Sequence, residues 1–160
     1  MTERNGYSGL QIGLHWTIAL LIGVNYLVSE GMEETFDGMM EGKAVTGWTP
    51  TIHVYVGVAV LVLVAIRILV RVTRGAPGPV QGGTLFDKLG EVSHWVLYAL
   101  MLAVPALGAI SWYLKIDQTA GLHVLVMNGM MILIGVHAVA ALFHQFVLKD
   151  HLLLRMMKRG

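Results

Sequence analysis

Seven histidines stand in a chain of 160 residues that is 56% hydrophobic and contains no cysteine. Six of them fall within or at the ends of long apolar stretches: His15, His53, His94, His123, His137 and His144. Ionisable side chains in such stretches are costly and usually functional. Neutral imidazoles bind metal ions and haem iron, and they relay protons. For each histidine taken alone, a hydrogen bond to a neighbouring helix is the competing interpretation.

The spacing of the histidines adds information that the residue type does not. His123 and His137 are 14 residues apart, which is nearly four helical turns, so both side chains project from one helix face about 21 Å apart. His53 opens an earlier apolar stretch at the end where His123 lies. His15 lies five residues into the first stretch, roughly level with His137. The spacing therefore predicts two facing pairs of histidines at two depths.

Two haems, each held by histidines of two helices, are the simplest occupants of these pairs. Zinc or copper is the competing choice, but such an ion prefers three or four close donors. Each depth offers two histidines of these pairs and no cysteine or carboxylate. The methionines that could serve copper, Met127, Met130 and Met131, are interpreted more simply as core packing. Haem is therefore the favoured cofactor.

Arg67 provides a second spacing of the same kind. It lies 14 residues after His53, so it reaches the second depth on the ligand-bearing face. A buried arginine needs an anion, and a haem propionate would supply one with bidentate geometry. In the alternative interpretation, Arg67 extends to the lipid headgroups at the end of its span. Both interpretations remain open at this point.

The elements that must position these side chains are four apolar segments, each long enough to cross a bilayer as a helix. They cover about residues 10–29, 51–70, 92–114 and 121–147. An acidic loop over 30–50 and a loop with prolines and arginines over 71–91 separate the first three, and a short polar turn joins the last two. We therefore predict an all-α fold, a transmembrane four-helix bundle that forms a single domain over residues 1–160.

The composition excludes several other classes of protein. Only 13% of the residues are charged, about half of the 25% typical of soluble domains, and the mean hydropathy is +0.68. The lack of cysteine excludes a disulfide-stapled fold, a cysteine nucleophile and thiolate-bound clusters. A net charge of +1 provides no basic field for nucleic acid. The first apolar segment lacks a cleavage site after it, so we expect it to remain in the membrane.

Charged residues divide between the two ends of the predicted bundle. Eight cations lie on the side of the termini and the middle loop: Arg4, Arg71, Arg74, Lys88, Lys149, Arg155, Lys158 and Arg159. The opposite side has Lys43 and Lys115 among six acids: Glu30, Glu33, Glu34, Asp37, Glu41 and Asp117. Because cytoplasmic loops carry the excess of lysine and arginine, we predict that both termini are cytoplasmic. In a bacterium, the protein would lie in the inner membrane with its acidic end toward the periplasm.

Over nearly its whole length the chain resembles the bacterial cytochrome b561 family of four-helix dihaem membrane proteins. The resemblance rests on GLQIGLHW at 9–16, IHV at 52–54, Arg67 with Arg71, GEVSH at 90–94, GVHA at 135–138 and LLRMM at 153–157. One departure is the insert between the third and fourth spans. It is shorter than in members that carry a Trp-His-Glu element there, and this changes the outer surface where an electron donor is received.

The resemblance implies two b-type haems and their axial ligands. His15 and His137 would hold the haem on the cytoplasmic side, and His53 and His123 the haem on the periplasmic side. Arg71, one turn after Arg67, would also bind a haem propionate. These assignments agree with the two depths that the histidine spacing predicts.

The family also implies electron transfer to membrane ubiquinone. It includes a superoxide oxidase, and related cytochromes anchor dehydrogenases and hydrogenases in the membrane. We therefore expect a superoxide:ubiquinone oxidoreductase. The alternative is a haem b anchor subunit that passes electrons between quinone and a periplasmic dehydrogenase or other redox protein. A structural bundle without a cofactor is a third class, which the paired histidine depths disfavour.

Three residues at the cytoplasmic end are candidates for the quinone site. His144 lies two turns beyond the last predicted ligand on the same face, where it could bind a quinone carbonyl and relay a proton. An interfacial histidine near headgroups is the competing interpretation. Lys149 follows at the water boundary. His94, near the end of the third span, is a quinone contact, a propionate partner or an alternative ligand.

Two lysines at the outer end are candidates for guiding superoxide to the haem. Positive charge steers an anion toward its site, and Lys43 and Lys115 are the cations at that end. The six carboxylates around them argue against strong anion steering. The same balance of charge is compatible with docking of a basic redox protein.

Overall fold

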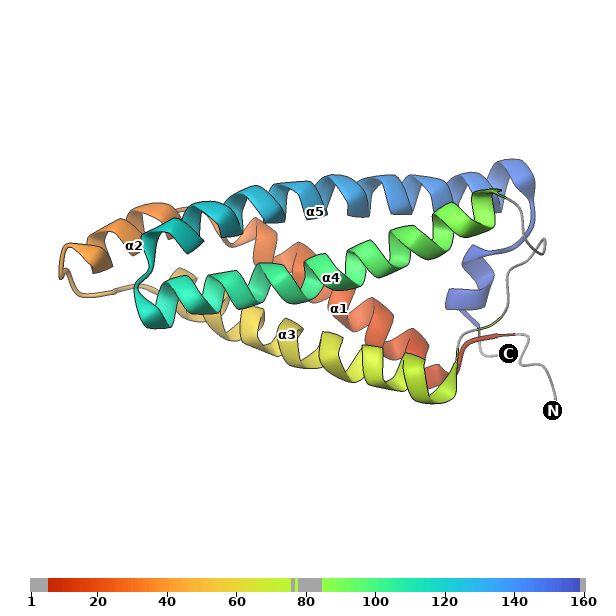
Figure 1. Ribbon diagram of the computed structural model, residues 1–160, viewed down its shortest axis with the longest axis horizontal. Coiled ribbons are helices and arrows are strands. Elements are labelled where there is room, and N and C mark those ends of the chain that lie inside the picture. Colours follow the sequence, from red (N-terminus) through yellow and green to blue (C-terminus); the bar gives the residue numbers. More distant parts are fainter. Residues whose placement is uncertain (1–5, 76, 78–84, 159–160) are drawn as a thin grey trace.

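The computed structural model describes residues 6–75, 77 and 85–158, and every regular element in these ranges is helical. Four long helices form an elongated bundle: α1 (Gly9–Leu27), α3 (Trp48–Arg74), α4 (Leu85–Leu114) and α5 (Asp117–Phe143). The first and last described residues lie at one end of it, and the short helix α2 (Met32–Met40) lies at the other (Figure 1). All four long helices contain stretches apolar enough to cross a membrane. The predicted all-α four-helix class is confirmed.

The helices extend beyond the predicted spans. α3 begins at Trp48 and ends at Arg74, so that Arg71 belongs to its last turn, and α4 begins at Leu85. The acidic segment that we predicted as a loop contains α2. This helix buries Phe36 and has Glu33 and Glu34 in its first turn, where carboxylates interact favourably with the helix dipole. Nine residues are too few to cross a bilayer, so a search for long apolar runs does not find it.

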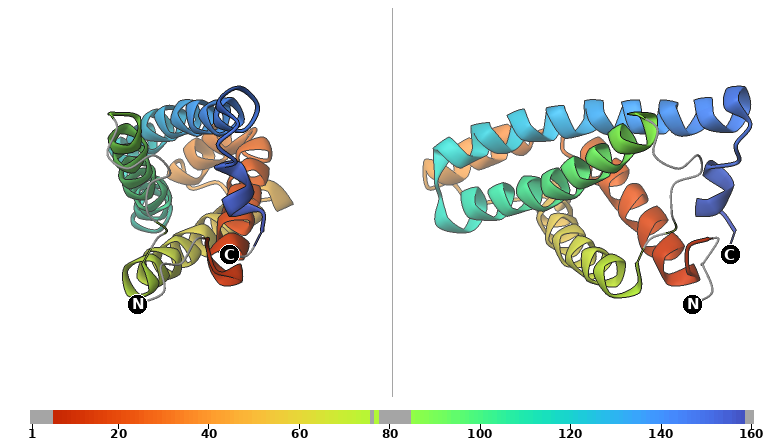
Figure 2. Two further views of the ribbon diagram at one scale, coloured as in Figure 1. Left: turned by 90° about the vertical axis from the view of Figure 1, so that its right-hand side faces the viewer. Right: turned by 45° about the vertical axis from the view of Figure 1, so that its right-hand side comes forward.

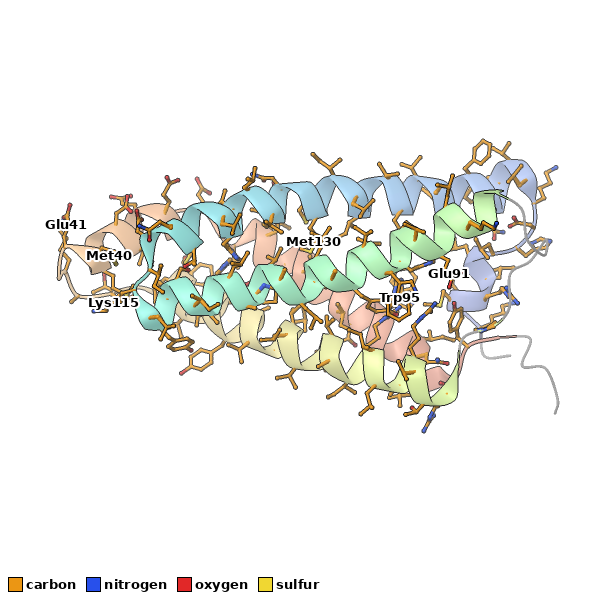
Figure 3. All side chains as sticks on the ribbon, viewed as in Figure 1. Met40, Glu41, Glu91, Trp95, Lys115 and Met130 are labelled. Carbon is orange, nitrogen blue, oxygen red and sulfur yellow. The ribbon has the colours of Figure 1, made fainter. Side chains whose placement is uncertain are left out.

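The four long helices pack in the order of the chain and share one core. α1 packs against α3, α3 against α4, and α4 against α5. The core cluster takes its buried side chains from all four helices: Ile18, Ile22, Val60, Val64, Tyr98, Val104 and Met130. Met130 is 3% exposed (Figure 3), and Met127 and Met131 pack against the same cluster. The three methionines therefore belong to the packed interior, in agreement with their interpretation as core residues.

One glutamine joins the start of α1 to the end of α3. Gln11 completes a capping box with Ser8, because the Ser8 amide donates to Gln11 Oε1 at 3.0 Å and the Gln11 amide donates to Ser8 Oγ at 3.3 Å. The Gln11 side-chain amide also donates to the Gly75 carbonyl at 2.9 Å. This buried side chain therefore fixes the start of α1 against the end of α3.

The chain folds back across the end of the bundle after α5. A π-helical turn, η1 (His144–Leu148), is followed by the 3₁₀ turn η2 (Leu153–Met156), which returns toward the start of α1 (Figure 2). The Trp16 indole N–H donates to the Met156 carbonyl at 2.8 Å and holds this segment in place. Arg4 and Arg159, which contribute to the predicted orientation, lie outside the described residues.

Candidate functional site

His53 of α3 and His123 of α5 face each other near the α2 end of the bundle. Their ring centroids are 6.2 Å apart and their planes are inclined by 84°. A single metal ion bound to one nitrogen of each ring at about 2 Å would hold the centroids about 6 Å apart. The separation of the two rings therefore suits one iron held between two imidazoles, and the pair is the one expected at the outer depth.

The orientation of the His123 ring is set by α4. Its Nδ1 lies 2.7 Å from the Val104 carbonyl oxygen. Because a carbonyl only accepts, Nδ1 must donate this hydrogen bond, and Nε2 carries the lone pair that a metal ligand needs. Gly108 leaves room for the ring, because a Cβ there would stand 3.0 Å from His123 Cε1 and 3.1 Å from Nδ1.

A cavity of about 680 Å³ adjoins the two rings and is lined by residues of α1, α2, α3, α4 and α5. This volume lies within the roughly 300–1,000 Å³ of sites that enclose a cofactor or small ligand. Gly57, one turn after His53, is part of its wall, and a Cβ there would meet only Asn25 Nδ2, at 3.9 Å. The cavity thus offers the open space that a macrocycle beside both histidines requires.

A second cluster of histidines lies nearer to the end with the termini. The rings of His94 on α4 and His137 on α5 are 5.2 Å apart between centroids. His15 on α1 lies within electrostatic range of both rings and of Arg67. The structure therefore gathers His15 and His137 at one depth and adds His94 to them.

Two arginines of α3 surround Tyr98 beside this cluster. Arg67 Nε donates to the Tyr98 hydroxyl at 3.1 Å, and the guanidinium carbons of Arg67 and Arg71 lie 5.7 and 5.8 Å from the Tyr98 ring centroid. Arg71 also lies over the ring of Trp95, at 5.7 Å. The Nη1 atom of Arg67 is buried and has no hydrogen-bond partner. A buried guanidinium atom without a partner fits an anionic group such as a propionate, and it does not fit an arginine extended toward headgroups.

His144 stands at the start of the π-helical turn and pairs with Asp150. Its Nδ1 is 2.5 Å from Asp150 Oδ2, and Asp150 Oδ1 accepts a hydrogen bond from the Leu152 amide at 3.1 Å. Burial acts to raise the pKa of Asp150, but the hydrogen bonds from His144 and Leu152 outweigh it and hold this pKa below its usual value. Lys149, between them, is exposed with a left-handed backbone at φ 56°. His94 does not lie with His144 and Lys149 but packs against His137, in the second cluster of histidines described above.

The lysines at the outer end are both exposed. Lys43 Nζ lies 2.6 Å from Glu41 Oε2, so its charge is largely balanced. Lys115 occupies the tight connection between α4 and α5 with a left-handed backbone at φ 54°. Figure 3 places Glu41 and Lys115 at the same end of the bundle, far from Glu91 and Trp95.

The described part of the chain contains no group of three or more histidine, cysteine, aspartate or glutamate side chains placed to hold a metal ion. Zinc and copper sites usually require three or four such donors. Two imidazoles flanking a large cavity fit haem iron instead, because the macrocycle supplies the other four ligands.

Several residues that lie close to the histidines or arginines were not expected from the sequence. They are Asn25, Tyr98, Val104, Gly108 and, as the partner of His144, Asp150. Asn25 and Tyr98 could have been noticed as polar side chains inside the predicted spans. The roles of Val104 and Gly108 depend on how α4 is rotated against α5, which no residue type reveals.

Comparison with known proteins is consistent across the whole chain. A family model described as prokaryotic cytochrome b561 matches residues 6–159. A protein named cytochrome b562, from Cereibacter sphaeroides, is 48% identical over 99% of both chains. A protein named probable superoxide oxidase CybB, from Yersinia pestis, is 34% identical over 96% of this chain and 98% of its own length. Cytochrome b561 homolog 1 of Escherichia coli is 28% identical over 97% and 98%.

No solved structure gives a significant match to the chain. The match to the family model extends over almost every residue, and the four membrane-capable helices agree with it. The chain therefore belongs to the prokaryotic cytochrome b561 family of four-helix membrane proteins, which carry b-type haem and transfer electrons in the membrane.

Proposed function

We propose that the chain carries electrons through two b-type haems from superoxide at its acidic end to quinone at the end with its termini. The observation that carries this proposal is the facing pair of His53 and His123, together with a second group of histidines, His15, His94 and His137, at another depth. His53 and His123, 6.2 Å apart between ring centroids, would bind the outer haem. His15 and His137, near Arg67, would bind the inner one.

When bound, haem supplies one-electron chemistry by cycling between ferric and ferrous iron. The residues of this chain would orient the haem and neutralise its charged groups. The Val104 carbonyl fixes the tautomer of His123, while Arg67 and Arg71, gathered at Tyr98, are suited to neutralise propionates. His94, against His137, would pack beside the inner haem.

The electron balance of the reaction is simple. Two superoxide anions each give up one electron and leave as oxygen, and one quinone takes both electrons and two protons to become a quinol. Superoxide as the donor is supported by the 34% identical relative named as a probable superoxide oxidase. A small anion needs no docking surface.

The inner end would receive the quinone and supply its protons. His144 and Asp150 share a hydrogen bond of 2.5 Å at the boundary of the last span, and a carboxylate holds an imidazole in the tautomer suited to proton transfer. Lys149, exposed beside them, would lie at the water boundary. We further propose that both termini are cytoplasmic and that the acidic end faces the periplasm, because the cations gather at the termini.

The charges at the outer end favour a second candidate function, a haem-bearing anchor that exchanges electrons with a basic redox protein. Glu33, Asp37 and Asp117 line the outer cavity, and Lys43 is paired with Glu41. An acidic rim around a haem attracts a basic partner and repels superoxide.

The donor is tested by mixing oxidised holoprotein with a superoxide source and a soluble ubiquinone. We expect haem reduction faster than spontaneous dismutation, followed by formation of quinol with two superoxide anions consumed per quinone. The measurement is stopped-flow absorbance of the haem together with quinol assay. If reduction is no faster than dismutation allows, the anchor function is favoured, and a basic redox protein copurified from membranes should then reduce the haem.

The assignment of the ligands predicts the loss of one haem at a time. His53→Ala or His123→Ala should remove the outer haem and leave about half of the haem content, because in either variant the outer iron loses one of its two protein ligands. His151→Ala, beyond the last span, is the matched control and should retain both haems. Haem content per protein and the reduced-minus-oxidised spectrum measure the result, and retention of both haems in the first two variants would contradict the pairing.

We predict that a side chain at Gly108 weakens binding of the outer haem through steric contact with His123. In Gly108→Ala, the new methyl group would stand 3.0 Å from His123 Cε1, so the ring must shift, which disturbs its hydrogen bond to the Val104 carbonyl. We expect weaker binding of the outer haem, by roughly 10- to 100-fold as for other residues that orient a metal ligand. Titration of apoprotein with haem measures this. Gly129→Ala on α5, where a Cβ would meet nothing within 4 Å, should bind as the parent does.

The proton path predicts an effect on quinone reduction alone. Asp150→Asn removes the charged acceptor of His144, and His144→Ala removes the imidazole itself. We expect quinone reduction to fall roughly tenfold or more, as for other general acid-base groups and their partners, with an unchanged haem spectrum. Glu30→Gln is the control, because Glu30 is exposed at the outer end and does not line the cavity. Equal rates in all four proteins would place the quinone elsewhere.

A further inference from the structure

One side chain in the wall of the outer cavity has no role in the reaction described above. Asn25 lies in the last turn of α1 and lines the cavity together with His53 and Gly57. Its Oδ1 atom is buried and has no hydrogen-bond partner, and the same holds for His53 Nδ1. The first atom is an acceptor, and the second is a donor whenever the other ring nitrogen binds a metal. Two complementary unpaired atoms therefore occur in one cavity.

The two histidines of the outer pair differ in how their second ring nitrogen is satisfied. A metal-bound imidazole almost always donates its remaining N–H to a carbonyl or carboxylate, which fixes its orientation and raises its basicity. His123 does so through the Val104 carbonyl at 2.7 Å. The Nδ1 atom of His53 has no such bond, so its acceptor must come from the residues that surround it.

Asn25 is placed to provide that acceptor. Its backbone carbonyl is also close enough to interact with the His53 ring, so Asn25 offers two oxygens, and the side-chain variants below separate the role of Oδ1 from that of the carbonyl. Its side-chain Nδ2 stands 3.9 Å from the position of a Cβ on Gly57, one turn along α3 from His53. The side chain therefore lies against the face of α3 that bears the histidine, and its Oδ1 and the Nδ1 of His53 are both buried and unpaired.

We propose that Asn25 is the positioning residue of His53 and accepts its Nδ1–H through Oδ1. This inference rests on the proposed binding of the outer haem by His53 and His123. The hydrogen bond would leave Nε2 of His53 free for iron, as the Val104 carbonyl does for His123. Because an accepted N–H makes the imidazole a stronger electron donor, it stabilises ferric iron. Asn25 thereby lowers the reduction potential of the outer haem.

The test is a redox titration of purified holoprotein, followed through the haem absorbance. Asn25→Leu has a similar size and no acceptor, and we expect its outer haem to be reduced more easily. The ferrous-to-ferric ratio at a fixed potential should rise about tenfold, equivalent to about 59 mV for a one-electron couple, with no shift for the inner haem. Asn25→Asp, with a stronger acceptor, should shift the outer haem in the opposite direction.

Asn128→Leu is the matched control, because Asn128 is a span asparagine on the exposed face of α5, and it should leave both potentials unchanged. His53→Ala identifies which potential belongs to the outer haem. Suppose that His53→Ala loses one haem but Asn25→Leu leaves both potentials unchanged. The acceptor is then not the Asn25 side chain, and the proposal for Asn25 is overturned. The assignment of His53 and His123 as a ligand pair stands. A shift confined to the inner haem overturns it as well.

The same variants also test the proposal if Asn25→Leu loses its outer haem and no potential can be measured for it. Retention of that haem in Asn25→Asp then supports the proposal, because the acceptor and not the asparagine itself is required. Loss of the haem in both variants overturns it, because an acceptor at this position would then not suffice. If His53→Ala retains both haems, the proposed ligand pair fails first, and this result is distinct from a failure of Asn25 alone.

Discussion

A polar atom inside an apolar bundle must find a partner, and this requirement governs the arrangement of the whole chain. Among the described residues, four buried side-chain atoms lack one: Asn25 Oδ1, His53 Nδ1, Arg67 Nη1 and Gln145 Oε1. The first two lie in the outer cavity, and the other two belong to residues near the opposite end. In the outer cavity the two unpaired atoms are complementary, an acceptor on Asn25 and a donor on His53, whereas the unpaired guanidinium atom of Arg67 needs an anion.

Two helices connect these depths rigidly. α5 carries His123 and His137, and α3 carries His53 and Arg67, with 14 residues between the members of each pair. A spacing near four turns keeps both members on one face about 21 Å apart, so each helix presents a proposed ligand or counter-charge at both depths. The distance between the two sites is therefore fixed by helix geometry, and α4 adjusts each site locally through Val104 at one end and Tyr98 at the other.

Helical periodicity explains why much of this arrangement could be predicted from the sequence. The spans and the facing of His53 with His123 follow from apolar length and spacing along single helices. What could not be predicted depends on contacts between helices or on local turns. Gly108 is important only because α4 turns it toward His123. The proximity of His94 to His137 depends on the packing of α4 against α5, and Asp150 reaches His144 only because a π-helical turn reverses the chain.

The two depths differ in charge, and this difference bears on the direction of electron flow. Arg67 and Arg71 lie beside the inner histidines, whereas Glu33 and Asp37 line the outer cavity. Positive charge near an iron centre stabilises the state that has gained an electron, and negative charge destabilises it. In a medium of low dielectric constant these interactions are strong, because little solvent screens them. The fixed charges of the chain therefore favour an electron at the arginine end, which agrees with the proposed reduction of quinone there.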